Sequence, residues 1–263
     1  MTAEIFETIE TTTQGAARWI ILSRPRVLNA MNSVCIRECR AALAEAEADP
    51  AVRTVVFTGA GDRAFTAGAD ISEISGFGPN EIRAYNRGWL DLFREIEMCR
   101  KPVIAAVHGW ATGGGTELSL ACDFVLCADT ARFGLAEINI GVIPGAGAAV
   151  RLTRWVGRLK AKEILMLGRL VDGAEAVALQ LANHCVPATD LRGAVQELAD
   201  ELGGKAPLAL GAAKASVNVG AEASFDVALE YELQEFIGLF ASDDQKEGMR
   251  AFLEKRKPNY TGT

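Results

Sequence analysis

Four short apolar runs, each bounded by turn residues, constrain the fold of this chain more than any other feature. These runs cover residues 17–25, 53–59, 101–109 and 123–129. Their composition is typical of buried strands. Between the first two runs, residues 31–50 have the pattern of an amphipathic helix, with Asn32 or Ser33 as its N-cap and Pro50 beyond its end. Strands separated by helices predict parallel crossovers and a sheet that is buried on both faces.

The pattern changes after about residue 147, where helical periodicity replaces the strand signals. Six helical runs, broken by glycine or proline, start at residues 147, 159, 172, 191, 207 and 224. The strand signal in this part is confined to residues 184–188. A chain of 263 residues fits one large α/β domain with a helical appendage. An apolar helical tail of this kind often packs on a neighbouring subunit.

Composition excludes several classes of protein. Hydrophobic residues make up 49% and charged residues 23% of the chain, which is typical of a globular protein. We expect neither a membrane span nor a secretory signal, because no long apolar run is present and the start lacks a basic segment followed by an apolar one. The expected compartment is the cytoplasm. A net charge of −7 argues against general nucleic-acid binding, although a local basic cluster could still bind an anion.

The six cysteines form no metal-binding or disulfide pattern. They are Cys35, Cys39, Cys99, Cys122, Cys127 and Cys185. None forms a CxxC pair, and no histidine stands at zinc-finger spacing from them. Cys35 and Cys39 are four residues apart on the first expected helix and share one of its faces. We therefore expect reduced, mostly buried thiols and no metal site.

Two loops of small residues are candidates for ligand binding. One covers residues 59–74, and the other precedes an expected helix and contains three consecutive glycines, Gly113–Gly115. Small residues let backbone N–H groups approach a ligand, and the first N–H groups of a helix are free to donate. If each loop donates one N–H to the same oxygen, the pair forms an oxyanion hole. One such donor stabilises a transition state by roughly 3–4 kcal/mol.

Two glutamates in apolar surroundings, Glu117 and Glu137, suit general acid and base catalysis. Burial raises a carboxyl pKa, and mutual repulsion separates the pKa values of two neighbouring acids, so that one stays ionised while the other holds a proton. Each has a simpler alternative. Glu117 could merely complement a helix dipole, and Glu137 could pair with Arg151 or Arg154. The triple glycine could likewise be only a turn or a packing site.

Taken together, these residues resemble the crotonase superfamily, the enoyl-CoA hydratase/isomerase family. Residues 101–147 carry the resemblance, and residues 23–32, 64–74 and 247–260 support it. The resemblance implies an α/β fold with a crotonase-like ββα-repeat spiral core, which we expect over residues 1–200. It also implies a helical C-terminal trimerisation region, expected over residues 201–263, and a homotrimer or a homohexamer made of two trimers.

The resemblance further implies reversible hydration of a trans-2-enoyl-CoA to a 3-hydroxyacyl-CoA, in the degradation of a fatty or related acyl chain. The backbone N–H groups of Ala69 and Gly114 match the oxyanion-hole donors. Glu117 matches the base toward water and Glu137 the acid toward C2, while the N–H of Gly145 resembles a group that positions water. The CoA belongs to the thioester substrate, and no separate cofactor is implied.

The resemblance also assigns residues to CoA binding. They are Arg24, Arg26, Leu28, Ala67, Asp70, Ile71, Phe252 and Lys255. The last two resemble residues that reach the CoA of a neighbouring subunit. Arg26 departs from the family, which more often has lysine there; arginine keeps the charge but changes its reach. Residues 71–89 correspond to a variable region that often lines the acyl pocket, so the acyl chain stays undefined.

Other functions remain open at this point. Δ3-Δ2-enoyl-CoA isomerisation or a specialised dehydration, such as that of carnitinyl-CoA or a hydroxymethylglutaryl-type substrate, would use the same oxyanion hole and one or both acids. A different class is a protein that binds acyl-CoA or RNA without catalysis. The presence of both glutamates and the absence of a basic stripe favour the hydratase.

Overall fold

The expected strands assemble into a six-stranded sheet in the computed structural model, which describes residues 6–263. The strands are, in spatial order, β1 (Ile9–Gln14), β2 (Ala17–Leu22), β3 (Thr54–Gly59), β5 (Val103–Val107), β7 (Phe124–Ala128) and β10 (His184–Val186). Only β1 and β2 are antiparallel; the other neighbours are parallel. The four apolar runs and the short run near residue 185 are thereby confirmed as strands.

A second sheet of four short strands was missing from the sequence-based expectations. Its order is β4 (Ala64–Thr66), β6 (Trp110–Thr112), β8 (Arg132–Gly134) and β9 (Leu170–Asp172). Each strand has three residues, too few for a periodic pattern, so two of them lie inside stretches that we expected to be loops. The edge strand β1 was also missed, because five of its six side chains are exposed and polar.

The two sheets arise from a ββα repeat. In each of the pairs β3–β4, β5–β6 and β7–β8, the first strand joins the six-stranded sheet and the second joins the four-stranded sheet. The principal helices that follow these pairs are α3 (Pro79–Met98), α4 (Gly114–Ala121) and α5 (Ala148–Leu167). This topology confirms the predicted α/β class and the ββα-repeat core.

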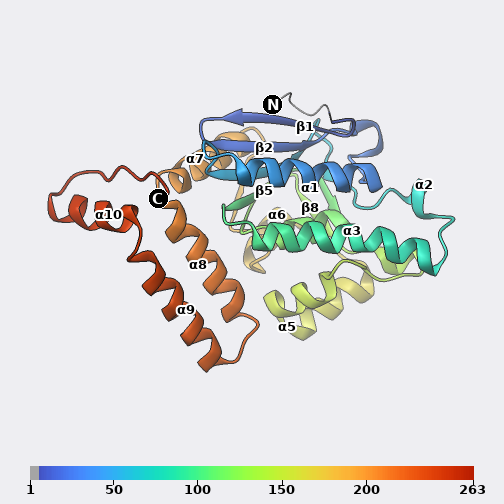
Figure 1. The fold of residues 1–263 in the computed structure, drawn as a ribbon. Coiled ribbons are helices and arrows are strands. Elements are labelled where there is room, and N and C mark those ends of the chain that lie inside the picture. The colour runs from blue at the N-terminus through green and yellow to red at the C-terminus, as the bar shows by residue number, and fades with distance from the viewer. Residues whose placement is uncertain (1–5) are drawn as a thin grey trace.

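Helices cover both faces of the six-stranded sheet, which explains why its strands are apolar without interruption (Figure 1). Ile20 and Val55 belong to the larger core, with α1 (Ser33–Ala48) and α3, while Trp19 and Val56 face α7 (Leu191–Gly203). The predicted N-cap is Asn32, whose Oδ1 accepts a hydrogen bond from the N–H of Cys35 at 2.9 Å.

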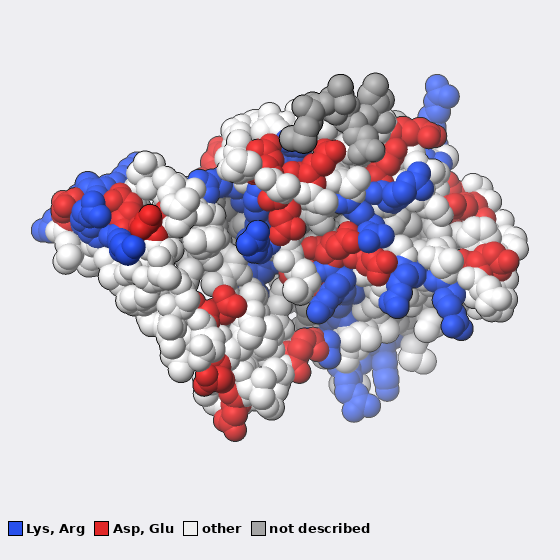
Figure 2. Space-filling view, in the orientation of Figure 1, with Lys and Arg blue, Asp and Glu red and all other residues white. Residues whose placement is uncertain are grey.

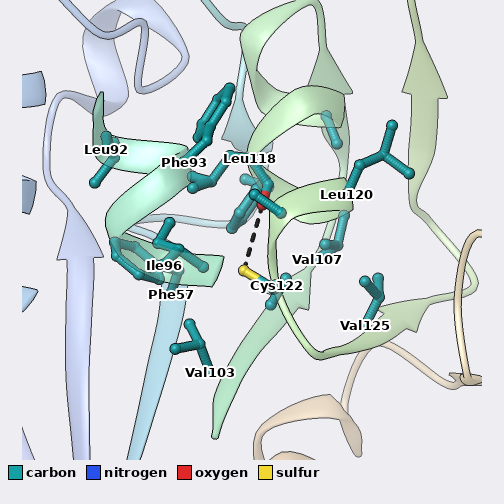
Figure 3. Packing of buried hydrophobic residues seen from close by; sticks show 14 of the residues in the cluster. Phe57, Leu92, Phe93, Ile96, Val103, Val107, Leu118, Leu120, Cys122 and Val125 are labelled. Carbon is teal, nitrogen blue, oxygen red and sulfur yellow. Dashed lines mark hydrogen bonds between the residues drawn. The ribbon is translucent and has the colours of Figure 1, made fainter. Parts of the chain in front are cut away.

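The larger core anchors α4, the helix that follows the triple glycine. Leu118 of α4 lies beside buried side chains of α3, including Phe93 and Ile96, while Leu120 points away from α3 within the same core (Figure 3). The thiol of Cys122 donates to the carbonyl of Leu118 at 3.3 Å and closes the end of the helix. Burying a large apolar side chain contributes about 1.5–3 kcal/mol. These side chains therefore attach α4 to the larger core.

The last three helices form an arm that projects from the sheets (Figure 1). They are α8 (Pro207–Gly220), α9 (Phe225–Leu239) and α10 (Asp243–Leu253). Neither α8 nor α9 has a buried residue, although both carry many apolar side chains. Their surface is mostly uncharged, whereas basic and acidic groups are mixed over α1 and α3 (Figure 2). This arm exposes apolar surface that the rest of the chain does not cover.

The remaining elements connect these layers. They are η1 (Pro25–Val27), α2 (Ile71–Ile74), η2 (Glu137–Ile140) and α6 (Gly173–Ala178). All six cysteines are free thiols, five of them buried, in agreement with the expectation from the sequence. Among residues 6–263, no helix is both long enough and apolar enough to span a bilayer.

Candidate active site

Each glycine of the Gly113–Gly115 run makes room for a different neighbour. A Cβ on the first, whose φ is +55°, would lie 3.0 Å from Oε1 of Glu137. A Cβ on the second would lie 2.7 Å from the indole of Trp89, and one on the third 2.4 Å from the carbonyl oxygen of Thr66. The run is therefore required by close packing on three sides, and its first member faces a carboxyl group.

The two small-residue loops meet at the start of α4. A Cβ on Gly68, whose φ is +86°, would lie 2.8 Å from the backbone nitrogen of Gly114 and 2.5 Å from the carbonyl oxygen of Thr112. Within the described residues, the N–H groups of Ala69 and Gly114 donate to no protein acceptor. Free donors on two adjoining loops are the arrangement that an oxyanion hole requires.

Glu117 lies in the first turn of α4 and is only 3% exposed. Its Oε1 accepts hydrogen bonds from the N–H groups of Ala146 and Ala148, each at 2.9 Å. Burial raises the pKa of this carboxyl to about 7, and the nearby charge of Glu137 also raises it, while the two amides and Arg151 oppose the rise. Glu117 is thus held in place by a separate segment and takes up a proton near neutral pH.

Glu137 opens η2, and burial raises the pKa of its carboxyl as well. Its Oε2 is buried and has no hydrogen-bond partner among the described residues. The arginines considered as partners are occupied elsewhere, since Arg151 pairs with Glu97 at 2.7 Å and Arg154 pairs with Glu222. The alternative in which Glu137 forms an ion pair with either of them is therefore wrong. A buried acid without a partner is available to a ligand.

The segment after η2 supplies contacts that sequence reasoning missed. Ala146 and Ala148 donate to Glu117 through their backbones, and a backbone donor has no residue-type signal. A Cβ on Gly145 would lie only 2.2 Å from Nδ2 of Asn86 in α3, so the side-chain amide of Asn86 packs directly on this glycine. Trp89 and Asn86 therefore place α3 against Gly114 and against the segment whose amides hold Glu117.

The residues assigned to CoA binding fall into two places. The first set lies on η1, on the loop after β4 and at the start of α2, where the N–H of Ala67 donates to the carbonyl of Leu28 at 2.9 Å. Arg26 is exposed there and forms no ion pair within residues 6–263, whereas Arg24 pairs with Asp70 at 2.8 Å. Phe252, which is 83% exposed, and Lys255 lie at the far end of the arm (Figure 1).

The arrangement combines two kinds of catalytic group. Two free amides can hold an oxygen that gains negative charge, and one buried and one half-buried carboxyl group, both of raised pKa, can exchange protons beside it. The charge of Glu137 raises the pKa of Glu117, so one acid can be ionised while the other is protonated. Such a site suits the addition or removal of a proton next to a carbonyl group.

Comparison with known proteins gives a consistent result. A family model described as enoyl-CoA hydratase/isomerase matches residues 12–263. A probable enoyl-CoA hydratase of Rhizobium meliloti is 42% identical over 97% of this chain and 98% of its own length. The short-chain-enoyl-CoA hydratase of Clostridium acetobutylicum is 38% identical over 93% of this chain and 94% of its own. A crystal structure of an enoyl-CoA hydratase from Bacillus anthracis is 35% identical, with a TM-score of 0.94 over 98% of this chain and all of that one.

Proposed function

This chain belongs to the enoyl-CoA hydratase/isomerase family and acts as an enoyl-CoA hydratase, and we propose that Glu117 and Glu137 carry out the hydration. The substrate is a trans-2-enoyl-CoA and the product a 3-hydroxyacyl-CoA, in a reaction that runs in both directions. One observation carries the assignment of residues: the buried carboxyl of Glu117 and the half-buried carboxyl of Glu137, both of raised pKa, adjoin two free amides at the glycine run.

The proposed reaction starts with the thioester oxygen on the N–H groups of Ala69 and Gly114. Ionised Glu117 removes a proton from water, and the water oxygen bonds to C3 of the substrate while the C2–C3 π electrons move toward the thioester carbonyl. The two amides stabilise the negative charge on that oxygen. Protonated Glu137 then donates its proton to C2, and Gly145 helps to position the water through its N–H. Dehydration exchanges the roles of the two acids.

We propose that CoA binds as part of the substrate and that no separate cofactor takes part. Arg26 is exposed and free of ion pairs in the described structure, so its guanidinium is available to a phosphate. The other contacts that the family resemblance suggests in the same chain are Leu28, Ala67 and Ile71, together with the segments of Arg24 and Asp70, whose side chains pair with each other. Phe252 lies on α10 and Lys255 follows that helix, so both belong to the arm and not to the segments of this set. We propose that they contact CoA on a neighbouring subunit.

We also propose how the chain is organised and assembled. Residues 1–200 form the catalytic core and residues 201–263 the helical C-terminal region, which mediates a homotrimer or a dimer of trimers. The uncovered apolar side chains of α8 and α9 support this role, because patches of that kind mark interfaces. The proposed compartment is the cytoplasm.

A panel of trans-2-enoyl-CoA and trans-3-enoyl-CoA thioesters of different chain length tests the proposed reaction. Mass spectrometry distinguishes the outcomes directly, because hydration adds one water and isomerisation leaves the mass unchanged. We expect each accepted 2-enoyl substrate to gain one water. Turnover of 3-enoyl substrates alone, without a change in mass, would show an isomerase, and tight binding without any turnover would show a non-catalytic protein.

A further inference from the structure

Two hydrogen bonds to the segment around Met31 flank the backbone of Ala69. The N–H of Met31 donates to the carbonyl of Gly68 at 2.7 Å, and the N–H of Asp70 donates to the carbonyl of Met31 at 3.1 Å. These bonds form a parallel bridge between Met31 and Ala69. In such a bridge the residue between the two bonds directs its own N–H away from the partner. The direction of the Ala69 amide therefore depends on the alignment of these two segments.

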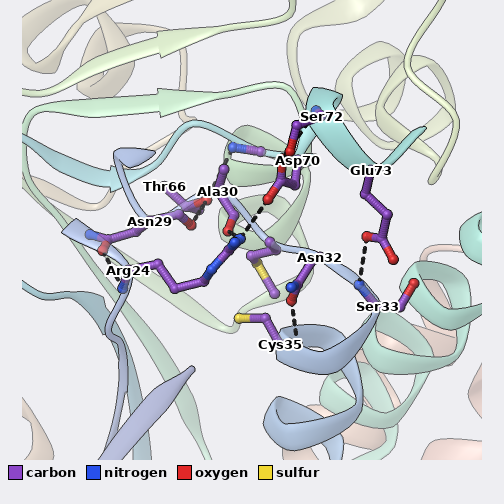
Figure 4. Close-up of polar contacts among 12 residues, drawn as sticks. Arg24, Asn29, Ala30, Asn32, Ser33, Cys35, Thr66, Asp70, Ser72 and Glu73 are labelled. Carbon is purple, nitrogen blue, oxygen red and sulfur yellow. Dashed lines mark hydrogen bonds and ion pairs between the residues drawn. The ribbon is translucent and has the colours of Figure 1, made fainter. Parts of the chain in front are cut away.

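Arg24 joins the same two segments a second time. Its Nη1 donates to the carbonyl of Ala30 at 2.5 Å and to Oδ2 of Asp70 at 2.8 Å. Ala30 comes directly before Met31, and Asp70 comes directly after Ala69. Figure 4 shows the Arg24 side chain directed toward Ala30 and Asp70, with dashed lines to both. One guanidinium nitrogen thus links the two strands of the bridge beside the proposed oxyanion donor.

Both oxygens of the Asp70 carboxylate accept hydrogen bonds from groups inside the protein. While Oδ2 accepts from Arg24, Oδ1 accepts from the backbone N–H of Ser72 at 3.1 Å and from its hydroxyl at 2.5 Å. The hydroxyl of Ser72 and the charge of Arg24 hold the pKa of Asp70 below its usual value. Asp70 is therefore ionised at neutral pH and caps α2 at the same time as it holds Arg24.

The backbone of Arg24 is fixed by Asn29, which is almost fully buried. Its Oδ1 accepts from the N–H of Arg24 at 3.0 Å, and its Nδ2 donates to the carbonyls of Ala60 and Ala64 at 3.0 and 2.8 Å. The carbonyl of Asn29 accepts from the hydroxyl of Thr66 at 2.7 Å. The backbone of Arg24 is consequently tied through Asn29 to β4 and to Ala60 ahead of it, while its guanidinium is tied to Asp70 in the segment after β4.

From this geometry we propose that the Arg24–Asp70 ion pair positions the Ala69 amide for the oxyanion hole, so that both act as positioning residues for catalysis. The proposal rests on the proposed function of Ala69 as an oxyanion donor. A positioning role and a direct CoA contact of these two side chains would affect different kinetic constants. A misplaced donor weakens transition-state stabilisation and lowers kcat, whereas a lost CoA contact raises KM.

The test uses Asp70→Asn and Arg24→Gln in the full-length protein. We expect kcat for a short-chain 2-enoyl-CoA to fall by roughly ten- to hundredfold in each variant. This fall is smaller than the loss of kcat that follows complete removal of one oxyanion-hole donor. KM should change by less than about threefold. Asp49→Asn is the matched control, because Asp49 pairs with Arg18 at 3.3 Å outside the proposed site, and its kcat should equal that of the wild type.

A spectroscopic measurement separates positioning from a general loss of structure. Butyryl-CoA labelled with ¹³C at the carbonyl cannot be hydrated, and its infrared carbonyl band moves to lower frequency when both oxyanion donors bind it. We expect Asp70→Asn and Arg24→Gln to lose part of this shift and Asp49→Asn to keep it. A full shift with unchanged kcat in the first two variants, or a rise in KM alone, would overturn the positioning role. If the wild type itself shows no shift, the proposed oxyanion hole is wrong instead.

Discussion

Among single residues, Glu117 shows how burial and backbone donors together set the chemistry of an acid. In water its carboxyl would be ionised at neutral pH, but the apolar surroundings raise its pKa to about 7. The amides of Ala146 and Ala148 keep one oxygen fixed, which leaves the other oxygen for water or substrate. An acid in this state can accept or release a proton at physiological pH with little cost.

This environment predicts a cost to stability that depends on pH. The folded protein keeps the proton of Glu117 up to about pH 7, whereas the unfolded chain loses it near the ordinary pKa of 4.5, so stability falls as pH rises through this range. Glu117→Gln removes the ionisation and keeps an oxygen for both amides. We expect its free energy of unfolding to exceed that of the wild type by about 1–3 kcal/mol near pH 8 and by little near pH 4. Urea unfolding at both pH values measures the gain; a loss of stability near pH 8 would contradict it.

The sequence identified the acidic residues of the site but not what surrounds them. Glu117 and Glu137 stand out because a carboxyl in an apolar run requires an explanation. The amides that hold Glu117 and the packing of Asn86 on Gly145 depend on segments far apart in the chain, and no local pattern encodes them. The pairing of Arg24 with Asp70 was missed for the same reason.

At the scale of elements, the strands of the large sheet other than its exposed edge strand β1 could be predicted, and those of the small sheet could not. The former are apolar on both faces because helices cover both sides, and this burial produces a strong signal. The latter have three residues each and are ordered by their neighbours. Helix α3 was also missed, because its stretch was interpreted as a variable region, although Trp89 and Asn86 of that helix contact the site.

The helices of the arm carry a prediction about assembly. Phe236 of α9 is 57% exposed and packs edge-to-face against Phe240 with ring centroids 5.1 Å apart, so an apolar pair faces outward. We expect the wild type to have three or six times the chain mass of 28.0 kDa in light scattering, and Phe236→Glu to shift it toward the monomer. Thr12→Glu adds the same charge on exposed β1 and should leave the mass unchanged. A monomeric wild type would contradict the proposed interface.

At the scale of the whole molecule, the fold brings together groups that are distant in sequence. The ββα repeat places the loops after β4 and β6 side by side, and these loops carry the free amides of Ala69 and Gly114. The segment from η2 to the start of α5 donates two backbone hydrogen bonds to Glu117, and η2 places Glu137 beside Gly113. The two-sheet core thus makes one site out of three consecutive repeats, and the arm lies apart from it (Figure 1).

The most direct test of the two-glutamate mechanism is the initial rate of hydration of a short-chain trans-2-enoyl-CoA by the wild type, Glu117→Gln and Glu137→Gln. Each substitution removes one proton-transfer group and preserves its size, so we predict a fall in kcat of roughly 10²- to 10⁴-fold in each. Glu45→Gln, on the exposed side of α1, should keep the wild-type rate. A wild-type rate of hydration in either Glu117→Gln or Glu137→Gln would contradict the mechanism.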